Sequence, residues 1–246
     1  MAKQIFTQNL SEPLDGATTA KFEINPGDGN LMIDKINSSE QDLANGMLEY
    51  LEKQDLPVRT SNKINGQTIF KLKAGGTGRQ PWFRLPWAAC NGATEWQIHL
   101  NPTVKSDITA HSDGGNVKLN LAGMSITGVM ADTGGGNVDV ILPDNSANLS
   151  VTARTGAGNV TVDVGENIKA NNTIKAESGA GNVTVLVPVG IAVRLDVTSG
   201  MGKVILDSQY SQFDNNIYQS PNYEAAADKI VITAKSGAGN VRVNTK

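Results

Sequence analysis

The stretch Thr155-Gly156-Ala157-Gly158-Asn159-Val160 decides the fold of this chain, because the sequence repeats it. The pattern Ser/Thr-Gly-x-Gly-Asn-Val recurs at residues 133–138, 178–183 and 236–241, with variants at 26–31, 112–117 and 199–204. The central copies lie 21, 22, 23 and 21 residues apart when counted at Asn116, Asn137, Asn159, Asn182 and Lys203. A fixed period near twenty residues is typical of a stacked repeat architecture.

Apolar residues occupy the same columns in each copy. In the copy at Asn159, Val151 and Ala153 precede the glycines, Val160 and Val162 follow them, and the residues between are mostly polar. This alternation predicts a half-buried strand on each side of the turn. The alanine column also indicates where the interior narrows. The repeats therefore predict an all-β fold, a β-solenoid of 21–23-residue coils with Gly-x-Gly-Asn turns.

The turns themselves carry two expectations. Gly156 and Gly158 have no Cβ, so we expect them to supply backbone conformations that other residues avoid. Stacking in register would place the asparagines in a ladder of side-chain amides, formed by Asn116, Asn137, Asn159 and Asn182. One outward column also alternates in charge, which favours pairing of adjacent strands: it holds His111, Asp132, Arg154 and Glu177.

The repeats are regular in the C-terminal part of the chain and less regular in the N-terminal part. Residues 104–246 form the repeat solenoid, and residues 1–103 form an N-terminal β-rich region that continues it, with one continuous domain as the alternative. Asn65-Gly66 predicts a hairpin between residues 58–64 and 67–73. Residues 38–54 fit a capped helix or a strand, and the β surroundings favour the strand. The alternative fold pairs the strands around each turn as hairpins in an antiparallel sandwich.

An insertion interrupts the repeats between Asp207 and Lys229. It ends in a helix-prone stretch, residues 224–228, so we expect a loop with a short helix against the last coil. Solenoid ends expose strand edges that need a cap or a partner. The insertion is the candidate cap for the coil that ends near residue 245, or a partner site if it projects outward. Its aromatic residues are Tyr210, Phe213, Tyr218 and Tyr223.

Composition excludes several classes of protein. The 246 residues carry a net charge of −3 and show no basic stripe, which excludes nucleic acid as a partner. The single cysteine, Cys90, excludes a disulfide framework and fits a reducing compartment. Neither an apolar secretory segment nor a stretch long enough to span a bilayer is present. The expected location is therefore cytoplasmic.

The sequence contains only weak matches to catalytic, nucleotide-binding or metal-binding motifs. Each Gly-x-Gly-Asn leads into a strand, whereas a nucleotide loop needs a following helix. His99, His111 and Cys90 are too few for a structural zinc site. Asp139 and Asp163 lie in different coils without a common site, so they do not form the paired carboxylates of a glycosidase. We expect no catalytic, metal or cofactor-binding residues, and a carbohydrate-active β-helix enzyme is the alternative.

The order of these features resembles the toast-rack domain, the C-terminal domain of LiaF-type regulators of bacterial cell-envelope stress, and the related putative-adhesin family. The resemblance rests on residues 22–31, 43–50, 96–100, 114–121 and 133–143, and on Asn222-Tyr223-Glu224-Ala225 before Ile230. It implies a β-solenoid without established enzymatic activity. It also implies a non-enzymatic interaction or scaffold protein, linked to envelope-stress signalling or surface interaction.

Two segments are candidate partner-binding sites. The aromatic and basic side chains typical of binding hot spots gather between prolines at residues 81–86, and they also occur in the insertion. Packing at the end of the solenoid is the competing interpretation. The expected partner is a protein, or a second molecule that associates through the solenoid ends. The candidate residues are Trp82, Phe83, Arg84, Trp87, Tyr210, Phe213, Tyr218 and Tyr223.

Overall fold

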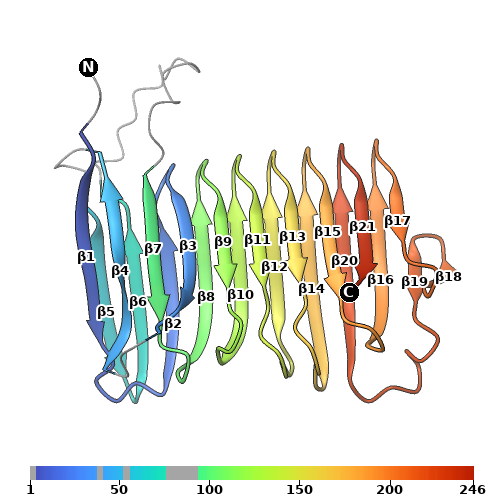
Figure 1. Ribbon diagram of the computed structural model, residues 1–246, viewed down its shortest axis with the longest axis horizontal. Helices are drawn as coiled ribbons and strands as arrows, with labels where there is room; N and C mark the ends of the chain where they lie inside the picture. Colours follow the sequence, from blue (N-terminus) through green and yellow to red (C-terminus); the bar gives the residue numbers. More distant parts are fainter. Residues whose placement is uncertain (1–3, 38–40, 52–55, 76–93) are drawn as a thin grey trace.

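The computed structural model describes residues 4–37, 41–51, 56–75 and 94–246. Its strands form two long mixed sheets that face each other along the molecule (Figure 1). No helix occurs in the part of the chain that the structure describes. The predicted all-β class is therefore confirmed. The short helix expected at residues 224–228 is wrong, because this stretch forms turns.

The first sheet, sheet A, has ten strands. In spatial order they are β1 (Phe6–Pro13), β4 (Asp42–Tyr50), β7 (Glu95–Leu100), β3 (Asn30–Lys35), β9 (Val117–Asn120), β11 (Val138–Ile141), β13 (Val160–Asp163), β15 (Val183–Val187), β21 (Val241–Thr245) and β17 (Val204–Leu206).

The second sheet, sheet B, has eleven strands. In spatial order they are β18 (Ser211–Asp214), β19 (Ile217–Gln219), β16 (Ala192–Ser199), β20 (Lys229–Ser236), β14 (Asn171–Ser178), β12 (Ser150–Thr155), β10 (Ile126–Thr133), β8 (Lys105–Ser112), β2 (Thr19–Asn25), β6 (Gln67–Lys73) and β5 (Val58–Ile64).

Equivalent strands of neighbouring repeats pair in parallel and in register. Ala131 faces Ala153 across β10 and β12, and Ala153 faces Ala176 across β12 and β14. On sheet A, Val160 likewise lies beside its counterpart on β15. This pairing rules out the antiparallel sandwich, in which the strands flanking each turn would pair with each other. Each repeat instead supplies one strand to sheet B, a glycine turn and one strand to sheet A (Figure 1).

The turns need glycine because neighbouring turns leave no room for a side chain. None of the glycines at residues 134–136, 156–158 or 179–181 has a positive φ, so the expected special backbone conformation is wrong. A Cβ on Gly158 would instead lie 2.0 Å from the carbonyl oxygen of Gly136 in the next turn. A Cβ on Gly181 would lie 1.9 Å from the carbonyl oxygen of Gly158. Stacked turns therefore approach so closely that only a hydrogen fits between them.

Two ladders of side chains lock the turns together. The hydroxyl of each Ser or Thr in the motif donates to a glycine carbonyl of the neighbouring turn, as from Thr155 to Gly136 at 2.7 Å. The Oδ1 atom of each asparagine accepts the backbone N–H of the next, as from Asn182 to Asn159 at 2.9 Å. The asparagine ladder thus runs mainly from side chain to backbone, and an amide–amide bond accompanies it at two steps, Asn116 to Asn30 and Asn182 to Asn159.

A single apolar core fills the space between the sheets, from Leu10 to Val243. The alanine column points inward as expected, and Ala153 and Ala176 are fully buried. Val204 departs from its column because β17 is the last strand of sheet A, and the side chain is 38% exposed. The predicted division at residue 103/104 stays a prediction.

The N-terminal region continues both sheets. Strand β2 pairs in parallel with β8, and β3 with β9. The predicted hairpin at Asn65-Gly66 is confirmed, with both residues at positive φ and β5 antiparallel to β6. The ambiguous stretch contains a strand, β4, as the β surroundings favoured. Trp96 lies on the expected strand and is buried.

The repeats do not follow one another along the sheets in the order of the sequence. Strand β20 lies between β14 and β16, and β21 lies between β15 and β17 (Figure 1). The last repeat, which was expected at the end of the sheets, therefore lies in their interior, and we name its strands β20 and β21 the inserted coil. The outer position belongs to β16 and β17, and the hairpin of β18 and β19 extends sheet B beyond β16.

Candidate functional site

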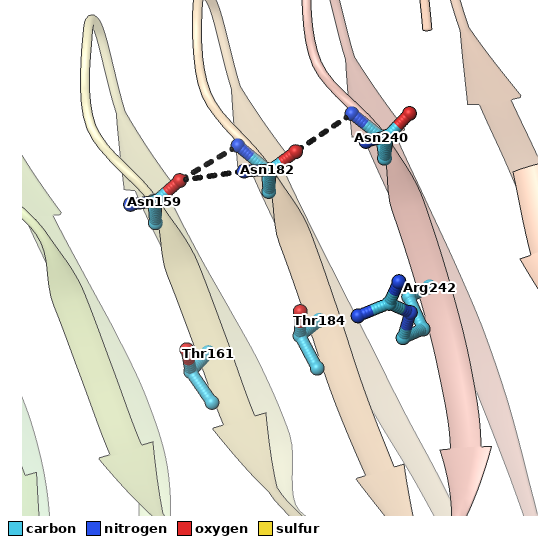
Figure 2. Close-up of a pocket in the computed structure, with 6 residues that line it drawn as sticks. All are labelled: Asn159, Thr161, Asn182, Thr184, Asn240 and Arg242. Atoms are coloured by element: carbon cyan, nitrogen blue, oxygen red, sulfur yellow. Dashed lines mark hydrogen bonds between the residues drawn. The ribbon is translucent and has the colours of Figure 1, made fainter. Parts of the chain in front are cut away.

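The outer face of sheet A carries a shallow polar groove where β13, β15 and β21 lie side by side (Figure 2). The groove has a volume of about 380 Å³. An upper row of asparagines and a lower row of hydroxyl and guanidinium groups line it. These residues are Asn159, Asn182, Asn240, Thr161, Thr184 and Arg242.

The asparagine row is rigid because each side chain is also part of the ladder. The Oδ1 atom of Asn159 accepts from the backbone N–H of Asn182, and Asn182 Oδ1 accepts from that of Asn240, at 2.9 and 3.0 Å (Figure 2). All three residues are exposed. The groove therefore presents amide groups at the spacing of adjacent strands, about 4.8 Å.

The lower row begins at Arg242 and continues past the groove to a carboxylate on β11. Asp139 pairs with Thr161, Thr161 with Thr184, and Thr184 with Arg242 on successive strands of sheet A. Arg242 is exposed and forms no ion pair within the described residues. We name these four residues the polar strip. It offers an acceptor end, two hydroxyl groups and a donor end on a flat surface.

The outer face of sheet B is charged in alternation, as the sequence predicted. Asp132 lies between His111 and Arg154, and Arg154 lies beside Glu177. His111 bonds Asp132 through Nδ1 at 2.8 Å and Asp113 through Nε2 at 3.0 Å. Partial burial lowers the pKa of His111, but its hydrogen bonds with the two carboxylates outweigh burial and raise that pKa above 6.5.

The predicted aromatic sites have different outcomes. Trp82, Phe83, Arg84 and Trp87 lie outside the described residues. In the insertion, Tyr210 and Tyr223 are buried, and Tyr218 packs against the core. Phe213 is 58% exposed, and the Arg194 guanidinium lies 5.2 Å from its ring centre.

The arrangement of acidic groups bears on the enzyme alternative. Asp139 pairs with Thr161, and Asp163 pairs with Ile141, so the two carboxylates are offset along β11 and β13. Lys246 forms an ion pair with Asp163. Within the ranges that the structure describes, no three His, Cys, Asp or Glu side chains gather as a metal site requires. In the same ranges no helix has the length and hydropathy needed to cross a membrane.

Residues 2–161 match the family described as the N-terminal domain of toast_rack, DUF2154. The chain belongs to the toast_rack family. Residues 147–243 of this toast_rack chain also match the family described as the C-terminal domain of LiaF, of the cell wall-active antibiotics response. The resemblance stated from the sequence is therefore confirmed. No curated protein is similar enough in sequence to count as a relative.

One solved structure shares the fold of this chain. A putative cell adhesion protein from Clostridium sporogenes superposes with a TM-score of 0.68 at 21% identity, over 99% of this chain and 100% of that one. A putative adhesin from Bacteroides fragilis gives a TM-score of 0.46 at 11% identity, over 98% of each chain. At these identities the first likeness shows the fold alone.

The sequence did not predict that this groove of the toast_rack chain is a candidate site. Thr161, Thr184 and Arg242 occupy the column two residues after the asparagine, and this column is the signal that could have revealed it. Sequence order, however, places Ile205 beside Thr184, and only the inserted coil brings Arg242 there.

Proposed function

We propose that the protein is a non-enzymatic interaction scaffold of the bacterial envelope-stress or surface-adhesion type, and that the polar strip and the asparagine row bind a protein partner. In this proposal each repeat is one coil of a rigid solenoid. The observation that carries it is the groove in Figure 2, in which regularly spaced amides, hydroxyls and a guanidinium line a flat sheet face. Such groups bind through many directional hydrogen bonds and one charge-assisted bond.

The family and its relatives support the class of partner. One matched family is described by its response to cell wall-active antibiotics, and the Clostridium sporogenes protein of the same fold is described as a putative cell adhesion protein. Both descriptions favour contact with other macromolecules. The cytoplasmic location expected from the sequence stays a prediction.

The test is site-specific photo-crosslinking in the bacterium that carries the gene, with and without a cell wall-active antibiotic. A photoreactive residue replaces Thr184 on the groove or, as a matched control, Thr152 on sheet B, which is exposed to a similar degree. We expect one dominant protein adduct from position 184 that Arg242→Glu weakens several-fold. Equal adducts from both positions, or an adduct insensitive to Arg242→Glu, would contradict the proposal.

The enzyme alternative makes a different prediction. A carbohydrate-active enzyme would hydrolyse or cleave a polysaccharide, and the activity would fall when Asp139 or Asp163 is replaced by Asn. Reducing-end assays on cell-wall glycans with both variants would measure it. Turnover that both substitutions abolish would replace the scaffold proposal by the enzyme.

A further inference from the structure

The interior position of the β20–β21 coil implies a slot in the stack. Along the chain, β14 and β15 lead into β16 and β17, yet these two coils do not touch as neighbours. Strands β20 and β21 separate them on both sheets. The coil therefore enters between two coils that precede it in the sequence.

The inserted coil forms the hydrogen bonds of the repeated motif with the strands and turns on both sides of this slot. Toward β14 and β15, Ser236 Oγ donates to the carbonyl of Gly181 at 2.7 Å, and the Asn240 N–H donates to Asn182 at 3.0 Å. Toward β16 and β17, Ser199 Oγ donates to the carbonyl of Gly239 at 2.8 Å, and the Lys203 N–H donates to Asn240 at 3.0 Å. A copy of the same coil is thus the occupant that fits both walls.

The apolar groups of the coil need the slot as well. Ile232, Ala234, Val241 and Val243 are fully buried between the sheets. A coil that leaves its slot would expose these side chains and unpaired backbone groups of six strands, its own two and the four that line the slot. Such exposure is unfavourable, so a released coil is stable only in its own slot or in a slot of the same shape in a second copy.

The segment that connects β19 to the inserted coil is the candidate hinge. Residues 220–228, here the strap, join the end of β19 to the start of β20, and these two strands flank β16. A cavity of about 650 Å³ lies between the strap and the loops around Ile168 and Val189. Polar bonds anchor both ends of the strap. The Val193 N–H donates to Ser220 Oγ at 2.9 Å, Asn222 Nδ2 donates to the carbonyl of Gly190 at 3.3 Å, and the Ala170 N–H donates to Asp228 at 2.6 Å.

The loop that bridges the slot is short for the step it covers. Residues 188–191 join β15 to β16 across the inserted coil, whereas residues 121–125, 142–149 and 164–170 make the corresponding crossing without any inserted coil. The bridging loop is the shortest of the four, by one residue, and covers the widest step, with Gly190 at φ +83°. This connection therefore limits how far the two walls of the slot can separate.

We infer that the slot also takes the β20–β21 coil of a second copy of this chain, which gives a strand-swapped dimer hinged at the strap. Exchange of an identical element needs no new interface, since every native contact is re-formed between copies. In the dimer, Asn240 and Arg242 of one copy complete the groove of the other. The inference rests on topology and is independent of what the groove binds.

The test uses two single-cysteine variants in a Cys90→Ser background. Lys175 of β14 and Thr233 of β20 are cross-strand partners on the outer face of sheet B. One chain carries Lys175→Cys and the other Thr233→Cys, and tags of different size distinguish them. The two chains are unfolded together and refolded at high concentration. A short bismaleimide then crosslinks cysteines that lie close together. A swapped dimer gives a covalent product of both chains. The control mixture replaces Thr233→Cys by Thr109→Cys, on the same face but on β8.

Strap length adds a second readout. Deletion of residues 222–227 leaves three strap residues, which span about 10 Å and barely reach across two strand spacings. We expect this deletion to raise the mixed product several-fold and a Gly-Ser insertion in the strap to lower it. If the deletion variant does not fold, the native-strap mixture decides alone. A mixed product no greater than in the Thr109→Cys control, or a shortened variant that is monomeric and as stable as wild type, would overturn the inference.

Discussion

A Cβ atom on Gly158 would lie 2.0 Å from the carbonyl oxygen of Gly136, well inside van der Waals contact. That oxygen is already fixed, because it accepts the hydroxyl hydrogen of Thr155 at 2.7 Å. The middle residue of each turn has no such neighbour. A Cβ on Gly135, for example, would make an ordinary contact at 3.7 Å. The motif therefore needs its outer glycines and tolerates alanine between them, as at Ala157.

We expect Gly158→Ala to lower the free energy of unfolding by about 1–3 kcal/mol, because the backbone must shift to admit the methyl group. The matched exchange Gly135→Ala should change it by less than about 1 kcal/mol. Denaturant unfolding of both variants measures the difference. Equal midpoints for the two would mean that the turns are not stacked at the distance described.

At the scale of the element, polar contacts pair strands that the core alone would not distinguish. His111 on β8 bonds Asp132 on β10, and both lie on the outer face of sheet B. The same alternation continues from Glu177 to Lys235, which are partners only because β20 lies beside β14. Opposite charges on adjacent strands favour this register over its neighbours.

The His111–Asp132 pair predicts a pH dependence of stability. The pKa of His111 is raised above 6.5 in the folded protein, so the folded state holds the proton more tightly than the unfolded chain. The stabilisation is therefore complete below about pH 6.5 and is lost as the pH rises through the folded pKa. The side chain is 36% exposed, so we expect a loss of only a few tenths of a kcal/mol.

The measurement is the urea midpoint between pH 5.5 and 8.5 for wild type and His111→Gln. Wild type should lose stability across this window more steeply than the variant, which has no proton to release at this position. Parallel profiles would show that His111 gains nothing from its two carboxylates in the folded state.

At the scale of the whole molecule, the two ends of the stack differ from its middle. The outermost turn carries Met201 and Lys203 where the interior turns have Ala or Gly and Asn. Lys203 donates the last bond of the asparagine ladder, from its N–H to Asn240 Oδ1, and has no side-chain amide oxygen to accept a further one. A lysine next to an edge strand, here directly before β17, also discourages pairing with another sheet. The hairpin of β18 and β19 covers the neighbouring edge of β16.

We expect Lys203→Asn to promote association through the edge of β17, because the substitution removes the charge and restores an acceptor for a further strand. Sedimentation should show concentration-dependent oligomers for this variant. Lys118→Asn, on an interior strand of the same sheet, should sediment like wild type. If Lys203→Asn also sediments like wild type, the end is protected by something other than this lysine.

The sequence predicted most of the fold, because buried columns and turn residues recur at a constant offset from Asn159. The order of the coils was not predictable from those columns. Ile232 and Ala234 are buried in the same columns as Leu195 and Val197, so the apolar pattern alone does not decide which coil lies beside β14. Since Arg242 lies beside Thr184 only because β21 is placed next to β15, the groove was not predictable either. In retrospect the atypical copy at residues 199–204 indicates the outer position, since terminal repeats depart from the consensus.

The polar strip has a consequence for selectivity. Asp139 and Arg242 are three strand steps apart on a sheet whose spacing is set by backbone hydrogen bonds, about 14 Å in all. A sheet tied by two ladders cannot stretch to suit a ligand. Under the proposed function, we expect the strip to favour a surface whose basic and acidic groups are about that far apart. Gain or loss of a single repeat between Asp139 and Arg242 would change this separation by one strand step, and we expect the preferred partner to change with it.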